Sequence, residues 1–67
     1  MKRLPQKLTH LELALRAVRA AVTELRFALA LERHSAAQRA LLEVDLRELH
    51  GTVATLVQRR RRAREAR

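Results

Sequence analysis

The feature that most constrains this 67-residue chain is the regular spacing of its leucines and valines. In the first half, apolar residues recur at intervals of 4, 3, 4, 3, 4, 3 and 4. Because this rhythm averages 3.5 residues, one apolar stripe of an α-helix always faces a partner helix, as in a coiled coil. The residues of this first seam are Leu4, Leu8, Leu11, Leu15, Val18, Val22, Leu25 and Leu29.

A second seam follows in a different phase. Leu29 and Leu42 are thirteen residues apart, one fewer than two heptads, so a single straight helix would turn the two stripes to different sides. The pattern therefore predicts two helices that fold back on each other. The second seam, at intervals of 4, 3, 4 and 3, consists of Leu42, Leu46, Leu49, Val53 and Leu56.

The segment between the seams carries the start signal of a helix. Ser35 is followed three residues later by Gln38, a capping box in which each side chain satisfies a backbone N–H that the helix leaves unpaired. Pro5 stands where the first turn of a helix tolerates proline. A connection this short makes the two helices antiparallel neighbours. Within one domain, 1–67, we expect helix one at about 5–32, a turn at about 33–35 and helix two at about 36–62.

Two alternatives stay open from the sequence. The turn region contains no glycine or proline, so one continuous helix with a stutter in its heptads is the main rival to the hairpin. Gly51 with Thr52 could also end one helix and begin another, giving three helices. Since Leu49 and Val53 keep the seam spacing across the glycine, we favour an unbroken helix, with a soft spot or a close helix–helix approach at Gly51.

Helix one is apolar over more than its seam. Its polar residues fall on one strip when the chain is wound at about 100° per residue, which leaves an apolar flank that helix two does not cover. Two hairpins packed together would bury that flank. The expected fold class is therefore all-α: an antiparallel two-helix hairpin with a coiled-coil type seam, dimerising into a four-helix bundle. The residues predicted at the dimer or partner contact are Leu13, Phe27, Leu31, Leu41 and Val44.

The side-chain chemistry argues against an enzyme. The chain has no cysteine and no tyrosine, and its one serine, Ser35, is expected in a helix cap. Glu12 lies four residues before Arg16, a spacing at which an ion pair stabilises a solvated helix. The same holds for Glu43 and Arg47. The three histidines lack the spacing of metal ligands, so we expect no catalytic residue, no metal and no cofactor.

The net charge of +8 is concentrated at the two chain ends. Residues 8–58 hold six arginines and six carboxylates, so their net charge is zero. A hairpin brings both ends to one pole, and the planar guanidinium of arginine suits bidentate contacts with phosphate or carboxylate. The basic tail is expected at about 59–67. The residues predicted to bind an anionic partner are Lys2, Arg3, Lys7, Arg59, Arg60, Arg61, Arg62, Arg64 and Arg67.

The hydropathy pattern predicts no membrane span. No stretch approaches the roughly 20 consecutive apolar residues that a spanning helix needs. The first residues, MKRLPQKLTH, lack the apolar run of a secretory signal. The absence of cysteine fits a reducing compartment, so we expect a cytoplasmic protein.

These features favour an interaction protein. We expect a non-enzymatic adaptor, regulator or inhibitor that forms a homodimer or packs against a partner protein with an apolar or acidic groove. The alternative is a sequence-tolerant RNA- or DNA-binding bundle that uses the arginine-rich end. Against this alternative, Phe27 is the only aromatic residue and lies far from the tail, so no ring is available there for base stacking.

Overall fold

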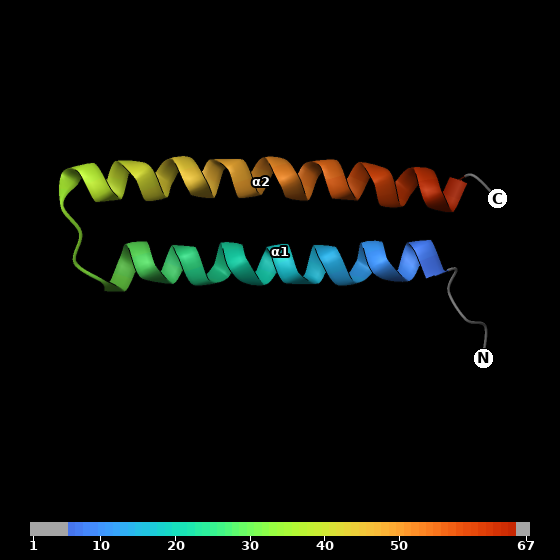
Figure 1. Ribbon diagram of the computed structural model, residues 1–67, viewed down its shortest axis with the longest axis horizontal. Coiled ribbons are helices and arrows are strands. Elements are labelled where there is room, and N and C mark those ends of the chain that lie inside the picture. The colour runs from blue at the N-terminus through green and yellow to red at the C-terminus, as the bar shows by residue number, and fades with distance from the viewer. Residues whose placement is uncertain (1–5, 66–67) are drawn as a thin grey trace.

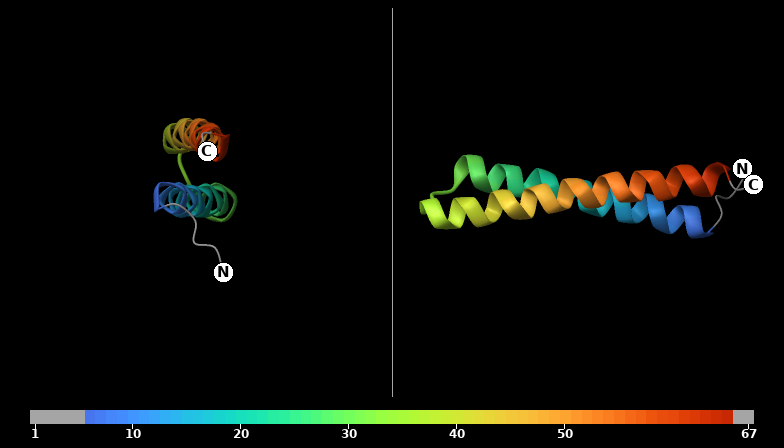
Figure 2. Two further views of the ribbon diagram at one scale, coloured as in Figure 1. Left: turned by 90° about the vertical axis from the view of Figure 1, so that its right-hand side faces the viewer. Right: turned by 90° about the horizontal axis from the view of Figure 1, so that it is seen from above.

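The chain folds into two antiparallel helices that lie side by side (Figure 1). The structure is a computed structural model that describes residues 6–65, with side chains from residue 9 onward. Helix α1 spans Gln6–Leu31 and helix α2 spans Ala36–Glu65. Together they form a rod of 49 × 21 × 12 Å, and the start of α1 and the end of α2 lie at the same end of it (Figure 2). The predicted hairpin is confirmed, and the single continuous helix is excluded.

The seam predicted from the leucine spacing is the face on which the helices meet. Leu15 is 1% exposed and Val22 is 8% exposed, and they are the buried hydrophobic residues of the described chain. α2 contributes no fully buried residue. The remaining seam residues with described side chains are half-buried: Leu11, Val18, Leu25, Leu29, Leu42, Leu46, Leu49, Val53 and Leu56.

The turn begins α2 with the predicted capping box. The Ser35 N–H donates to Gln38 Oε1 at 3.0 Å, and the Gln38 N–H donates to Ser35 Oγ at 3.1 Å. The Arg39 N–H donates to the Ser35 carbonyl at 2.9 Å, which closes the first turn of the helix. These bonds satisfy backbone donors at the start of α2 that have no partner within the helix.

The end of α1 is capped by side chains that follow it in the sequence. His34 Nε2 lies 3.0 Å from the Ala28 carbonyl oxygen, to which the tautomer protonated at Nε2 donates. Arg39 Nη1 donates to the Leu29 carbonyl at 3.0 Å. The last carbonyls of a helix need such partners, and glycine commonly helps to supply them. Here a histidine and an arginine do so, and no described residue, glycine included, has a positive φ.

Helix α2 continues unbroken through Gly51. A Cβ placed on Gly51 would meet no atom within 4 Å, so no neighbouring helix approaches closely at this point. The unbroken helix is therefore confirmed, whereas the predicted close approach does not occur within the hairpin. α2 also runs to Glu65, three residues beyond its expected end at 62, so the described part of the basic tail is helical.

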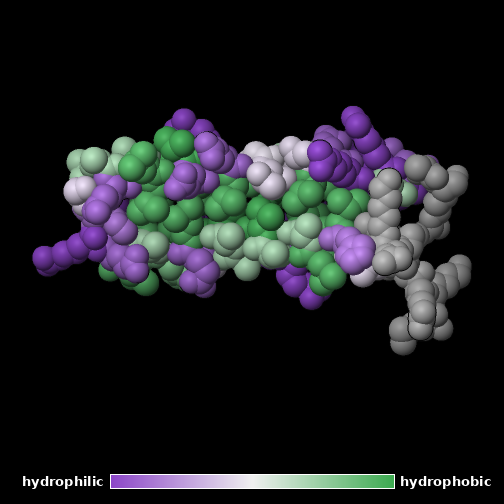
Figure 3. All heavy atoms as spheres, viewed as in Figure 1, coloured by the Kyte–Doolittle hydropathy of each residue, from purple (hydrophilic) through white to green (hydrophobic). Residues whose placement is uncertain are grey.

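Apolar and charged side chains occupy separate regions of the surface of the rod. Figure 3 shows a hydrophobic band along the line where the two helices meet, bordered by hydrophilic residues. Hydrophilic residues dominate α2 at the end away from the turn. Neither helix, over its described residues, is long and apolar enough to cross a membrane.

Candidate interaction surfaces

The first candidate surface lies on the side of α1 that faces away from α2. Leu13 stands midway between the seam residues Leu11 and Leu15, so it is about 200° around the helix from each. It is 51% exposed. Phe27 is placed in the same way between Leu25 and Leu29 and is 54% exposed, and Leu31 is 78% exposed. The hairpin therefore leaves about half or more of each of these large apolar side chains uncovered.

These outward residues have a heptad rhythm of their own. Starting at Leu13, the positions on this side of α1 follow at intervals of 4, 3, 4, 3 and 4. The pattern is a second coiled-coil seam, opposite the first and interrupted by one carboxylate. We call it the outer stripe of α1, and it consists of Leu13, Ala17, Ala20, Glu24, Phe27 and Leu31, all of them exposed.

The other two predicted contact residues lie on a different surface. Val44 stands midway between the seam residues Leu42 and Leu46, so it points away from α1, and it is 45% exposed. Leu41 is 67% exposed and lies on the flank of α2. The structure thus separates the five predicted contact residues into the outer stripe of α1 and a smaller apolar surface on α2.

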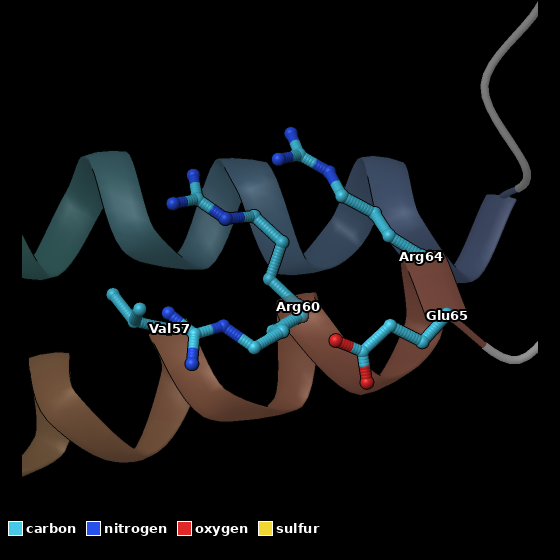
Figure 4. A pocket seen from close by; sticks show the side chains of 5 residues that line it. Val57, Arg60, Arg64 and Glu65 are labelled. Atoms are coloured by element: carbon cyan, nitrogen blue, oxygen red, sulfur yellow. The ribbon is translucent and has the colours of Figure 1, made fainter.

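The second candidate surface is the end of the rod away from the turn, where arginines of α2 reach across to α1. Arg60 Nη1 donates to both Glu12 carboxylate oxygens, at 3.2 Å to Oε1 and 3.3 Å to Oε2. Arg64 Nη2 donates to Glu12 Oε1 at 3.1 Å. Figure 4 shows the Arg60 and Arg64 side chains extending from α2 towards α1. One carboxylate therefore holds two of the predicted anion-binding arginines.

The ion pairs within single helices differ from those expected. Glu12 was predicted to pair with Arg16, but it binds the two arginines of α2 instead. Glu43 was predicted to pair with Arg47, but it lies 3.9 Å from Arg39 Nε, on the side of the turn. Arg39 thus contacts both a carboxylate of α2 and a carbonyl of α1. Glu12 therefore forms its ion pairs between the two helices, and Glu43 forms its ion pair with a residue closer to the turn.

Three arginines of the basic end stay exposed on the last turns of α2. Arg59, Arg61 and Arg62 take no part in the ion pairs found among residues 6–65. The structure brings these arginines to the same end of the rod as the start of α1. The other predicted anion-binding residues, namely Lys2, Arg3, Arg67 and the side chain of Lys7, lie outside the part of the chain that is described.

A shallow pocket of about 330 Å³ lies among the arginines at this end. Arg60 and Arg64 form part of its lining and turn towards Glu12, while Glu65 adds a carboxylate to the wall. The local positive charge is therefore partly neutralised by the protein itself. No group of three or more His, Cys, Asp or Glu side chains placed to hold a metal ion is found among the described residues.

In comparisons with models of known families, with curated proteins and with solved structures, nothing matches the chain.

Proposed function

We propose that this protein is a non-enzymatic helix-packing module, an adaptor, regulator or inhibitor, whose outer stripe of α1 binds a further helix. That helix belongs either to another copy of the chain or to a partner protein. The cationic end of the rod contacts acidic groups of the partner, which speeds association and sets its orientation. The cysteine-free chain fits a reducing compartment, and the proposal places the module in the cytoplasm.

The observation that carries the proposal is the imbalance between the buried and the exposed apolar side chains. Among the residues whose side chains the structure describes, two hydrophobic ones are buried, Leu15 and Val22, whereas five large ones are 45–78% exposed. The accessible surface is 5829 Å², compared with about 4,300 Å² for a compact chain of the same 7.7 kDa. An exposed apolar stripe of this regularity is typical of a surface that binds another helix.

The chemistry of the polar side chains also fits a module that is not an enzyme. The only serine hydroxyl accepts a hydrogen bond from the Gln38 N–H in the helix cap. Glu12 is held by Arg60 and Arg64. Catalysis needs a nucleophile or an acid–base pair within a concave site, and these groups already serve the fold.

The proposal is tested by placing a charge in the outer stripe. Phe27→Asp should abolish self-association or partner capture, because it puts a carboxylate where an apolar contact is required. Sedimentation velocity over a range of protein concentrations gives the readout, with circular dichroism as a check that the hairpin still folds. Ala54→Asp is the matched control, since it adds the same charge at an exposed position of α2. Association by Phe27→Asp equal to that of the wild type would refute the proposed contact.

One observation favours a second candidate function, the binding of RNA or DNA without sequence preference. Arg59, Arg61 and Arg62 are exposed and are not engaged by the carboxylates of the described chain. Guanidinium groups free of internal partners are available to contact phosphates. The engagement of Arg60 and Arg64 by Glu12 reduces the number of such groups, so we rank this function second.

A further inference from the structure

We infer that the helix bound by the outer stripe of α1 is α1 of a second copy of this chain, running antiparallel in one defined register. In this register Leu13 lies opposite Leu31 of the second copy, Ala17 opposite its Phe27, and Ala20 opposite its Glu24. The inference rests on the proposed function and adds to it the identity, direction and register of the occupant.

When two copies of the outer stripe run in opposite directions, the large and small residues of one copy are complementary to those of the other. The midpoint of the stripe falls at position 22, so each outer-stripe residue has a partner at the same distance on the other side of that point. The reversal pairs leucine with leucine at the two ends and alanine with phenylalanine between them. Facing positions that alternate large and small side chains interdigitate without voids. The alanines also allow the two helix backbones to approach closely around Phe27.

A parallel arrangement lacks this complementarity. In parallel register each residue meets its own equivalent, so Phe27 would face Phe27, and Ala17 would face Ala17 and leave a gap. Glu24 would face Glu24, and like charges directly opposite each other are destabilising. In the antiparallel register the two Glu24 carboxylates are staggered by four residues, about 6 Å along the axis, and each lies beside an alanine.

The distribution of charge along the rod also favours the antiparallel direction. Residues 22–49, the half nearest the turn, hold five carboxylates and four arginines, a net charge of −1. The other residues of the described chain, 6–21 and 50–65, hold eight cations and two carboxylates, a net charge of +6. Parallel association would place two strongly cationic ends together. Antiparallel association places each cationic end beside the nearly neutral, carboxylate-containing half of the other copy, which lowers the repulsion.

The available area matches what a stable dimer requires. The outer stripe runs from Leu13 to Leu31, about 27 Å along the helix. A standard protein interface buries about 800 Å² on each partner. The surface of this chain exceeds that of a compact chain of equal mass by about 1,500 Å², as expected of a rod whose long sides are uncovered. The dimer would have the helix order α2, α1, α1, α2, with Leu41 and Val44 outside the interface.

Disulfide trapping tests the direction and the register, because the chain has no cysteine of its own. Chains carrying Leu13→Cys are labelled uniformly with ¹⁵N, mixed in equal amounts with unlabelled chains carrying Leu31→Cys and oxidised mildly. The mixed disulfide and the two homodimers then differ in mass and are quantified by mass spectrometry. We expect the mixed disulfide to predominate. In the proposed dimer, two cysteines at position 13 are about 27 Å apart, far beyond disulfide range. A predominance of Leu13→Cys homodimers would overturn the antiparallel arrangement.

Sedimentation of point variants separates this inference from the proposed function. Phe27→Asp should weaken the dimer at least about 30-fold, since buried aromatic anchors dominate interfaces. Val44→Asp, which adds the same charge on the far side of α2, should leave the dimer unchanged. If Phe27→Asp disrupts assembly but position 13 links to position 13, the contact surface stands and the antiparallel register is wrong. If Phe27→Asp assembles as the wild type does, both the contact surface and the antiparallel register are wrong. If the wild type is a monomer at all concentrations, the helix bound by the outer stripe does not come from a second copy of the chain.

Discussion

At the scale of single residues, the Glu12 side chain joins the two helices of the described chain through three hydrogen bonds. Its carboxylate accepts hydrogen bonds from Arg60 and Arg64, which come from the last turns of the other helix. The Glu12 side chain is 31% exposed and that of Arg60 is 21% exposed, so water screens this contact less than it screens an ordinary surface pair. The contact holds the end of α2 against the beginning of α1.

Replacing Glu12 by glutamine tests the strength of this contact. We expect Glu12→Gln to lower the free energy of unfolding by about 1 kcal/mol, the upper range for ion pairs of limited burial. The loss should shrink at high salt, which screens the charges in the wild type. Urea unfolding followed by circular dichroism at two salt concentrations and one protein concentration measures it, because association also changes the apparent stability.

A matched variant shows whether the loss comes from the contact with the two arginines. Glu48 is exposed on α2 and takes no part in the ion pairs of the described chain, so Glu48→Gln removes the same charge without breaking such a contact. We expect it to change the free energy of unfolding by less than half as much. Equal effects of the two substitutions would mean that net charge, and not the Glu12 contact, determines the difference.

At the scale of the helices, the turn shows how a chain can reverse without glycine or proline. Ser35 and Gln38 start α2, while His34 and Arg39 bind the carbonyls that end α1. Four side chains within six residues therefore bind backbone groups at both helix ends. This local set of bonds, together with the change of seam phase, favours the hairpin over one continuous helix.

Substitutions of Ser35 test how much the capping box contributes to stability. Ser35→Ala removes the hydroxyl that accepts the Gln38 N–H, and we expect a loss of about 1 kcal/mol in the free energy of unfolding. Ser35→Asp keeps an acceptor at the start of the helix and should retain most of the wild-type stability. Thermal and urea unfolding of both variants give the comparison. Equal losses for alanine and aspartate would contradict the role assigned to the cap.

The sequence predicts some of these features better than others. The seam and the capping box could be predicted because each depends on spacing within a single helix or turn. The contact of Glu12 with Arg60 could not, because it joins residues 48 positions apart and depends on how far one helix slides along the other. The end of α2 at Glu65 was missed in part for the same reason, because the contact of Arg64 with Glu12 of α1 also depends on how the helices align. In addition, arginine is a good helix former, which favours extension of the helix through the basic tail.

The heptad spacing of the outer stripe is present in the sequence, but few large apolar residues mark it. Three of its six positions are Ala17, Ala20 and Glu24, which carry little or no hydrophobic signal. The apolar flank could be predicted from the placement of the polar residues around the helix, whereas its heptad order becomes clear once α2 is placed on the opposite side. The separation of Leu41 and Val44 from the outer stripe likewise depends on knowing which sides of the two helices meet.

At the scale of the whole molecule, the rod is polarised. Within residues 6–65, cations outnumber carboxylates at the end where α1 begins and α2 ends, and the turn lies at the other end, where carboxylates and arginines nearly balance. A field of a single sign attracts anions to the cationic end and raises the rate at which acidic partners associate. The same field would attract nucleic acid, so a binding experiment must distinguish a local arginine site from the effect of net charge alone.

Titration of a generic single-stranded oligonucleotide at two or more salt concentrations makes that distinction. If Arg59, Arg61 and Arg62 contact phosphates, the logarithm of affinity should fall against the logarithm of salt with a slope near −2, from about −0.7 per contact. Replacing these three arginines by glutamine should remove most of the slope. The matched control replaces three exposed arginines of α1 by glutamine, which gives an equal loss of charge: Arg16, Arg19 and Arg26.

The two triple variants lead to different conclusions. Binding lost in the α2 variant and kept in the α1 variant would support a phosphate-binding site on the last turns of α2. Equal losses would attribute binding to net charge, because both variants drop from +8 to +5. No binding by the wild type at about 50 mM salt, where phosphate contacts are strong, would eliminate nucleic acid as a partner. The cationic end would then act on acidic protein surfaces, as the helix-packing module requires.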